Sequence, residues 1–289
     1  MRPPRRSLAR APPPSPSISE ADRAADGATP GLEYIHGLQL IHTDLKPENV
    51  MFTRPLGQIF AGTPLAGSMM GRRGGEKAAG PAEGAAPAAA AAPDADAAGW
   101  ADGWRHVDAD WARRVASSGL VHCKLVDFGN ACWTHKHFTD DIQTRQYRSP
   151  EVIMGAKYST PVDVWSMACM TFEVATGDHL FDPRSKPKQY TRDEDHLALF
   201  MELLGKMPKR LTSRGRYARE YFNRAGELRN IRRLNFWPLD KVLEEKYKFP
   251  EAHARALASF VLPMLDFVPE KRATAAEALR AGWIGPAAP

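Results

Sequence analysis

The sequence predicts an α+β fold with a mainly α-helical body. In the C-terminal two thirds, apolar residues recur at helical spacing, as at Leu197, Phe200 and Leu204. Two short apolar runs, residues 40–41 and 121–126, predict strands that are each followed by polar residues. The 289 residues, 43% of them hydrophobic, suffice for one sizeable domain or two.

Composition argues against several classes of protein. The 39 Lys and Arg residues against 34 Asp and Glu residues leave a net charge of +5, too mild an excess to indicate nucleic-acid binding. The three cysteines, Cys123, Cys132 and Cys169, lack metal-ligand spacing. Two of them lie in apolar runs and are expected to be buried thiols, as in a reducing compartment. Neither a run of 18 apolar residues nor a secretory signal is found, so no membrane span is expected.

Changes in composition divide the chain. The segment 55–118 is a low-complexity insert rich in Ala, Gly and Pro, which predicts disorder. Near its end, residues 108–114 predict a short amphipathic helix next to three tryptophans, Trp100, Trp104 and Trp111. This helix either packs on the lobe, binds a partner or has no role. The other expected parts are a Pro/Ala/Arg-rich tail, two pieces of one large lobe and a short C-terminal tail: 1–30, 31–54, 119–284 and 285–289.

Capping residues mark where several helices begin. Thr160 followed by Pro161 predicts the start of a helix that runs to Gly177 and is apolar nearly all round, as expected of a buried central helix. A second helix begins near 193–195 and ends at Gly205. Residues 257–265 predict another helix, and Thr274 with Glu277 three residues later forms the capping box of the last one.

The most informative stretch is residues 42–49, His-Thr-Asp-Leu-Lys-Pro-Glu-Asn. Phosphoryl transfer from ATP needs a carboxylate to orient and deprotonate the attacking hydroxyl, and oxygen ligands for Mg²⁺. Asp44 supplies the carboxylate, Asn49 supplies a side-chain oxygen, and Lys46 places a positive charge near the transferred phosphate. The pattern H-x-D-x-K-x-x-N is that of a protein-kinase catalytic loop, except that Thr43 stands where most kinases have Arg.

Two further motifs follow in the order that a kinase requires. Asp127-Phe128-Gly129 comes after the predicted strand, and its Asp is the principal Mg²⁺ ligand in kinases. Ser149-Pro150-Glu151 resembles the A-P-E signature, with Ser in place of Ala. Together the three motifs predict ATP and Mg²⁺ as the cofactors.

Residues 31–283, the insert apart, resemble the SR-protein kinases, which phosphorylate serines in Arg-Ser repeats. The resemblance rests on Thr43 beside His42 and Asp44 and on five further runs: 127–133, 135–139, 141–149, 176–178 and 190–196. It implies an α+β protein-kinase-like fold. Neither a G-x-G-x-x-G loop nor a V-A-I-K strand precedes Asp44, so the small β-rich nucleotide lobe is expected to be absent from this chain.

The resemblance also implies roles for residues outside the catalytic loop. Gly129, Thr144 and Glu151 fall in the activation segment, and Arg272 is expected to form a buried ion pair with Glu151. Asp163 either caps its own helix or holds the backbone of the catalytic loop. Members of the family usually have Leu at the position of Phe128, and this exchange keeps an apolar residue.

An Arg-rich substrate requires acidic docking residues, and four candidates lie close together in sequence: Asp178, Asp193, Glu194 and Asp195. The alternative is an ordinary helix start, where the helix dipole favours carboxylates. Because Thr43 replaces the usual Arg, no basic partner for a phosphate on the activation loop is evident. Activity is therefore expected without prior loop phosphorylation.

The expected function is that of a constitutively active serine/threonine kinase of Arg/Ser-rich proteins, truncated here. We expect a monomer of the cytoplasm and nucleus that binds neither nucleic acid nor membranes directly. The alternative is a catalytically silent fragment that holds Arg-Ser proteins. The trio Asp44, Asn49 and Asp127 favours the kinase, whereas the missing nucleotide lobe favours the silent fragment.

Overall fold

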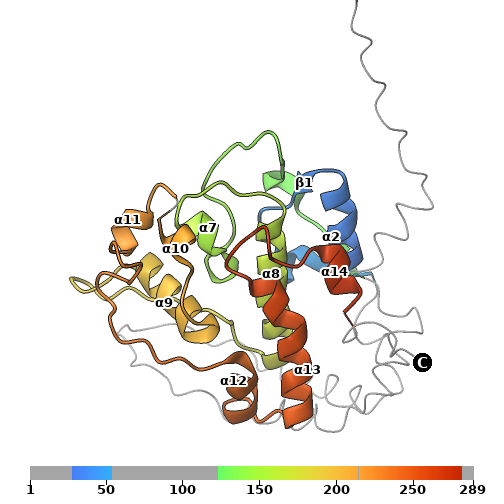
Figure 1. Ribbon diagram of the computed structural model, residues 1–289. Coiled ribbons are helices and arrows are strands. Elements are labelled where there is room, and N and C mark those ends of the chain that lie inside the picture. The colour runs from blue at the N-terminus through green and yellow to red at the C-terminus, as the bar shows by residue number, and fades with distance from the viewer. Residues whose placement is uncertain (1–27, 54–122, 214, 282–289) are drawn as a thin grey trace, which may run out of the picture.

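The computed structural model describes residues 28–53, 123–213 and 215–281, which form a mainly helical lobe (Figure 1). The whole insert 55–118 with its predicted helix at 108–114, the C-terminal tail and residues 1–27 of the N-terminal tail lie outside the described residues, whereas residues 28–30 of that tail form the start of the first helix. The helices are α2 (Ala28–Gly37), α7 (Pro150–Ile153), α8 (Pro161–Thr176), α9 (Arg192–Leu204), α10 (Lys209–Thr212), α11 (Ala218–Tyr221), α12 (Leu239–Glu245), α13 (Glu251–Val261) and α14 (Ala275–Leu279). The strands are β1 (Leu40–Ile41), β2 (Val50–Phe52), β3 (Cys123–Leu125) and β4 (Cys132–Trp133).

Helix α8 occupies the centre of the lobe, with α9 to α11 on one side and α2 and α14 on the other (Figure 1). Its residues 162–170 are all buried, as the sequence predicts, and Trp165 packs against Phe200 with ring centroids 4.8 Å apart. The helix ends at Gly177, whose φ of 80° is the left-handed conformation that favours glycine. The predicted cap is wrong in one respect, because the Thr160 side chain makes no capping hydrogen bond and its backbone is already helical.

Two short antiparallel sheets join the chain before the insert to the chain after it. In β1–β4, Ile41 pairs with Cys132, and in β2–β3, Met51 pairs with Lys124. The pairings place the catalytic loop beside Asp127, although 78 positions separate Asn49 from this residue. Within the described ranges the sheets have only two strands each, and no β-rich nucleotide lobe is found among them.

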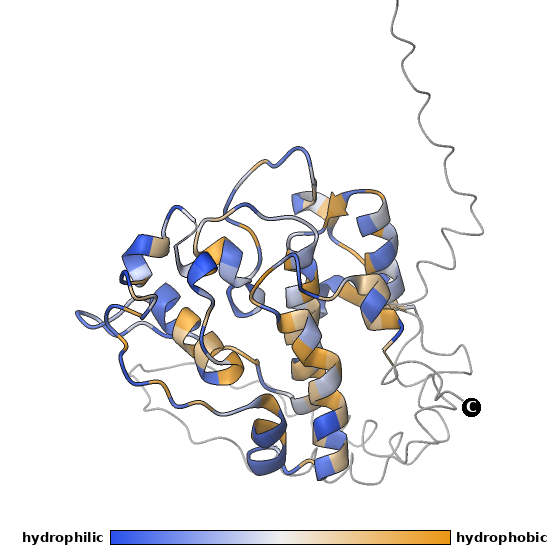
Figure 2. Ribbon diagram, viewed as in Figure 1, coloured by the Kyte–Doolittle hydropathy of each residue, from blue (hydrophilic) through white to orange (hydrophobic). Residues whose placement is uncertain are grey.

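The helix predicted from 193–195 is present as α9, and the one predicted at 257–265 is present as α13 and the 3₁₀ turn Leu262–Leu265 that follows it. Hydrophobic and hydrophilic residues lie along both α9 and α13 (Figure 2). The Thr191 hydroxyl caps α9 by accepting from the Glu194 N–H at 3.1 Å. In α14, Thr274 and Glu277 form the predicted capping box. None of the helices in the described part of the chain is long and apolar enough to cross a membrane.

The predicted ion pair between Glu151 and Arg272 is present and bidentate. Arg272 Nη1 lies 2.7 Å from Glu151 Oε1, and Nη2 lies 3.0 Å from Oε2. Arg272 also donates to the Pro161 carbonyl at 2.9 Å, and its guanidinium lies 5.0 Å from the Trp165 ring centroid. The pair ties α7 to the segment before α14, and the loss of one partner would leave the other charge buried and unpaired.

Candidate active site

The Asp44 carboxylate lies at the centre of the candidate active site, between two side chains that donate to it. Lys46 Nζ donates to Oδ2 at 2.9 Å. The Thr144 hydroxyl donates to Oδ1 at 2.6 Å, and the Thr144 N–H donates to the same oxygen at 3.2 Å. The activation segment and the catalytic loop therefore meet at the carboxylate that the sequence predicts to act as the base.

These contacts determine the charge states of both groups. Partial burial alone would raise the pKa of Asp44, but the hydrogen bonds from Thr144 and Lys46 and the positive charge of Lys46 together hold it below its ordinary value. The hydrogen bond to Asp44 raises the pKa of Lys46. At neutral pH the site thus holds an ionised carboxylate, which can accept a proton, beside a fixed positive charge.

Asp163 holds the backbone of the catalytic loop from the first turn of α8. Its Oδ2 accepts from the His42 N–H at 2.8 Å, and its Oδ1 accepts from the Thr43 N–H at 2.9 Å. His36 Nε2 lies 2.9 Å from Oδ2. Both oxygens of this fully buried carboxylate therefore accept from the backbone of the catalytic loop. This is the loop-holding role considered for Asp163, and not the capping of its own helix.

Asn49 and Asp127 provide oxygen donors of the kind that Mg²⁺ prefers. The Asn49 amide nitrogen donates to the Asp44 carbonyl at 2.8 Å, which leaves the amide oxygen on the opposite side of the planar group. The Val126 N–H donates to the Asn49 carbonyl at 3.0 Å, so the segment before Asp127 is fixed against the loop. The Asp127 side chain is exposed.

This donor set fits Mg²⁺ as a partial ligand set. Within the described ranges, no group of three His, Cys, Asp or Glu side chains gathers as a metal site. Mg²⁺ is commonly held by one or two protein oxygens, with phosphate oxygens and water completing the octahedron. Asn49 and Asp127 would therefore hold the ion together with a bound nucleotide.

Three residues of the site have a left-handed backbone although none is glycine. The φ values are 70° at Thr43, 64° at Asp127 and 66° at Gln143. Such conformations cost on the order of 1–3 kcal/mol each and persist where the surroundings hold them. For Thr43 these surroundings include both its N–H bond to Asp163 and its hydroxyl bond to the Asn130 carbonyl, at 2.9 Å.

Gln143 organises the activation segment, a role that our sequence analysis missed. Its Nε2 donates to the Val162 carbonyl and to the Ser166 hydroxyl, both at 2.8 Å. Its Oε1 accepts from the Ser149 N–H at 2.9 Å, and its own N–H donates to the Thr43 carbonyl at 2.8 Å. The buried amide thus links the segment to α8 and to the catalytic loop. A lone Gln in a polar run carries no sequence signal for this role, and the same is true of His36.

Gly129, the other predicted residue of the activation segment, is exposed in the short 3₁₀ turn Phe128–Asn130. A Cβ atom at this position would lie 3.5 Å from Asp127 Oδ1, an ordinary van der Waals distance. The Phe128 ring is 40% exposed and lies 4.9 Å from the His42 ring, centroid to centroid. His42 in turn places Nε2 2.9 Å from the Val126 carbonyl, which adds a second link between the two motifs.

The four acidic residues predicted to dock substrate differ in how far protein partners occupy them. Glu194 is only 1% exposed, and its two oxygens accept from the N–H and the side-chain amide of Asn230, both at 2.6 Å. Asp193 is bonded to Arg145 and, at 3.2 Å, to the Tyr221 hydroxyl. The geometry of Glu194 suits a structural role and leaves it no surface for a substrate.

The other two candidates, Asp178 and Asp195, are more accessible to solvent than Glu194. Asp178 is exposed, and its Oδ2 accepts from Lys246 Nζ at 3.1 Å and from the Tyr247 hydroxyl at 2.8 Å. Asp195 uses Oδ2 to accept from the Arg184 N–H at 2.8 Å. Docking of an Arg-rich segment therefore stays a prediction. Asp178, Asp193 and Asp195 are better candidates for this role than Glu194.

Comparison with known proteins places this site in a family. The protein kinase domain model matches residues 116–284. SRSF protein kinase 3 of Homo sapiens is 55% identical over 166 residues, which cover 57% of this chain and 29% of that protein. The serine/threonine-protein kinase SRPK of Physarum polycephalum is 43% identical over 273 residues, 90% of this chain and 59% of that protein. Protein kinase dsk1 of Schizosaccharomyces pombe is 50% identical over 164 residues, 57% of this chain and 30% of that protein.

The matched domain covers more than half of the chain, and these relatives agree with the resemblance of the motifs. The chain belongs to the protein kinase family, in the group of the SR-protein kinases. The lobe described above, with its few strands, is consistent with the α+β kinase fold. The chain spans less than a third of the Homo sapiens and Schizosaccharomyces pombe relatives and 59% of the Physarum polycephalum relative.

Proposed function

We propose that this chain belongs to a serine/threonine kinase that transfers the γ-phosphate of ATP to serines in Arg/Ser-rich proteins. The observation that carries the proposal is the placement of Asp44. Its ionised carboxylate is hydrogen-bonded to Lys46 and Thr144. Asp163 holds the loop that contains Asp44. Asn49 donates to the Asp44 carbonyl, and the charge of Asp127 acts on Lys46. Both residues follow Asp44 along the chain in the order of the kinase motifs.

In the proposed reaction, Asp44 orients the serine hydroxyl and receives its proton while the serine oxygen bonds to the γ-phosphorus. The bond from that phosphorus to the bridging oxygen of ADP breaks. Lys46 places its positive charge beside the oxygens of the transferred group. Asn49 and Asp127 would hold Mg²⁺, which neutralises phosphate charge when bound.

The proposal includes activity without a phosphorylated activation segment. The Thr43 hydroxyl binds the Asn130 carbonyl, and Gln143 binds the segment to α8, so uncharged groups already fix the loop. Arg148 adds two bonds to the Gln143 carbonyl, at 3.1 and 2.8 Å. A phosphate is not needed to create these contacts.

The substrate class is proposed from charge. Asp193 and Asp195 lie in the first turn of α9 and Asp178 follows the end of α8, and Arg pairs with carboxylates in a bidentate geometry. The names of the relatives, which include SRSF protein kinase 3, agree with this class. We place the protein, as a monomer, in the cytoplasm and nucleus on the same family basis.

The test starts by mapping the 5′ end of the transcript and producing the protein that it encodes. We expect this protein to transfer label from γ-labelled ATP to an Arg-Ser repeat peptide. Transfer to a Glu-Ser peptide of equal length should be at least roughly tenfold slower, since like charges repel. Pretreatment with a phosphatase should leave the rate unchanged.

Absence of transfer to the Arg-Ser peptide would refute the kinase proposal. If the protein still bound that peptide, the alternative of a silent Arg-Ser-binding module would replace it. A rate abolished by phosphatase would refute only the part of the proposal that concerns the activation segment.

A further inference from the structure

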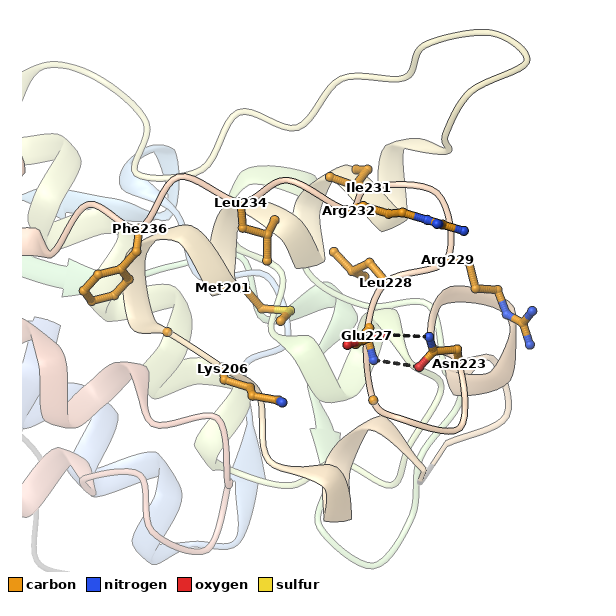
Figure 3. A pocket seen from close by; sticks show the side chains of 12 residues that line it. Met201, Lys206, Asn223, Glu227, Leu228, Arg229, Ile231, Arg232, Leu234 and Phe236 are labelled. Carbon is orange, nitrogen blue, oxygen red and sulfur yellow. Dashed lines mark hydrogen bonds between the residues drawn. The ribbon is translucent and has the colours of Figure 1, made fainter.

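The described part of the chain contains a hollow that the candidate active site does not use. It lies between the end of α9 and the chain segment 223–236, with a volume of about 910 Å³ (Figure 3). Its apolar lining includes Met201, Leu228, Ile231 and Leu234. Phe236 lies at one end and is 62% exposed, so its ring adds accessible apolar surface to that of the lining.

The rim of this groove is basic. Lys206, Arg229 and Arg232 border it, and in the part of the chain that the structure describes no carboxylate lies within 4 Å of their charged groups. Within the described residues, Nε is the only guanidinium nitrogen of Arg229 with a hydrogen bond, which it donates to the Arg219 carbonyl at 2.9 Å. The single acidic lining residue, Glu227, accepts from the Asn223 amide at 3.0 Å (Figure 3).

These charges define the chemistry of a ligand for the groove. An Arg-rich substrate would bring positive charge against Lys206, Arg229 and Arg232, so electrostatics disfavour it here. An acidic segment with large apolar side chains would pair with the rim and cover the exposed ring of Phe236. Aromatic residues are the most effective of these side chains, because each buries a large apolar area.

One segment of the chain outside the described residues has this chemistry. Residues 94–111 contain five aspartates and a single arginine, a formal charge of −4 with His neutral, and all three tryptophans of the insert. The segments 1–27, 54–93 and 112–122 carry more basic than acidic residues, and 282–289 has no charged side chain. Segment 94–111 is therefore the best match to the groove among the parts of this chain.

The connecting chain is long enough for this segment to reach the groove. Forty residues separate Thr53 from Asp94, and 11 separate Trp111 from Cys123. Fully extended, these connections span roughly 130 Å and 40 Å at about 3.3 Å per residue. A lobe of this size is expected to be only about 40 Å across, from its radius of gyration.

We propose that the acidic, tryptophan-containing segment 94–111 of the insert docks in the basic groove between α9 and residues 223–236 of the same molecule. The tryptophans cover the apolar floor, and the aspartates face Lys206, Arg229 and Arg232. The proposal is independent of phosphoryl transfer, and its failure would leave the proposed function untouched.

A labelled peptide of residues 94–111 tests the contact by fluorescence anisotropy. The receptor is the full chain with Trp100→Ala, Trp104→Ala and Trp111→Ala, so that its own segment does not compete. We expect saturable binding that weakens as the salt concentration rises. The same peptide with its three tryptophans replaced by alanine should bind at least tenfold more weakly.

Charge reversal in the groove identifies the place of binding. Adding Arg229→Glu and Arg232→Glu to the receptor should weaken its binding of the peptide at least tenfold. The matched control, Lys157→Glu with Lys271→Glu, changes the net charge equally at exposed positions elsewhere and should leave binding within about twofold. If circular dichroism shows that the charge-reversed receptor is unfolded, the variant with Arg229→Ala and Arg232→Ala takes its place in the experiment. Absence of binding, or binding that both groove variants leave unchanged, would overturn the proposal.

Hydrogen exchange tests whether the docking occurs within one molecule. Amides of residues 228–234 should exchange more slowly in the unmodified chain than in the variant without the three tryptophans, by the same factor at every protein concentration. Protection that grows with concentration would assign the groove to a second copy and overturn the proposal. Equal exchange in the two proteins would do so as well.

Discussion

The carboxylates of the candidate active site and the carboxylate of Glu194 at the start of α9 are used in opposite ways. Asp44 and Asp127 keep part of their surface accessible, and the donors around Asp44 adjust its charge without enclosing it. Glu194 is buried, and the donors of Asn230 occupy both its oxygens. The comparison suggests a division between carboxylates that are available for chemistry and carboxylates that hold the fold together.

Glu151 and Asp163 belong with Glu194 in the second group. Each is at most 2% exposed, and each has donors on both oxygens. If the division is correct, changes to these residues reduce stability first. Changes to Asp44 should reduce activity and leave stability nearly unchanged.

The largest effect on stability is expected from Arg272→Met. This change leaves the Glu151 carboxylate buried without its partner, and removal of one member of a buried pair costs about 3–5 kcal/mol. The free energy of unfolding, measured with urea, should fall by this amount. Arg280→Met, at an exposed position, should change it by less than about 0.5 kcal/mol. A loss below about 1 kcal/mol for Arg272→Met would show that the pair is not structural.

A somewhat smaller loss is expected from Asp163→Asn. The change turns one acceptor oxygen into an amide donor that faces a backbone N–H of His42 or Thr43. An unsatisfied buried group costs about 1–3 kcal/mol, and a group that has lost a charged partner costs more. Urea unfolding of Asp163→Asn and of the exposed control Asp182→Asn measures the difference. Equal stability of the two variants would contradict the role given to Asp163.

Glu194→Gln and Asp195→Asn test the division between structural and available carboxylates within α9 itself. Glu194→Gln should cost about 1–3 kcal/mol, because one of its buried acceptors is lost. Asp195→Asn should cost less than about 1 kcal/mol and should instead weaken binding of an Arg-Ser peptide. If Glu194→Gln weakened peptide binding without loss of stability, the two roles would be exchanged.

The smallest effect concerns His196, which is fully buried with neither ring nitrogen hydrogen-bonded within the described residues. Burial first, and then the positive charges of Arg145, Arg148 and Arg192, hold its pKa well below the usual value. The folded state thus keeps His196 neutral, whereas the unfolded chain binds a proton below about pH 6.5. Its contribution to stability is complete above that pH and is lost as the pH falls, by at most about 1.4 kcal/mol per pH unit.

Substitution isolates this contribution. Between pH 7 and pH 5.5, the free energy of unfolding of His196→Phe should decline less steeply than that of the unmodified protein. His253→Phe, at an exposed position of α13, is the matched control and should keep the original slope. Parallel slopes for all three proteins would contradict the assignment.

The parts that could be predicted from sequence are those set by local patterns or by motif spacing. The burial of α8, the apolar periodicity of α9, the capping box at Thr274 and the pairing of Glu151 with Arg272 are present as predicted. The side chain of Thr160 does not cap α8, because the residue has already taken up helical φ and ψ.

Contacts that depend on packing could not be predicted in this way. Nothing in a run of acidic residues distinguishes buried Glu194 from accessible Asp195, since the difference arises when Asn230, 36 positions later, packs against α9. The roles of Gln143 and His36 also arise only when distant segments meet. The predicted helix at 108–114 lies outside the described residues and stays a prediction.

The most direct test of the division among carboxylates is Asp44→Asn, measured for transfer and stability in the same preparation. We expect transfer to an Arg-Ser peptide to fall by about 10²–10⁴-fold, the usual contribution of a general base. The free energy of unfolding should change by less than about 1 kcal/mol, and binding of the peptide should be retained. Transfer within about tenfold of the unmodified rate would contradict the role of Asp44, and a large loss of stability would contradict the division itself.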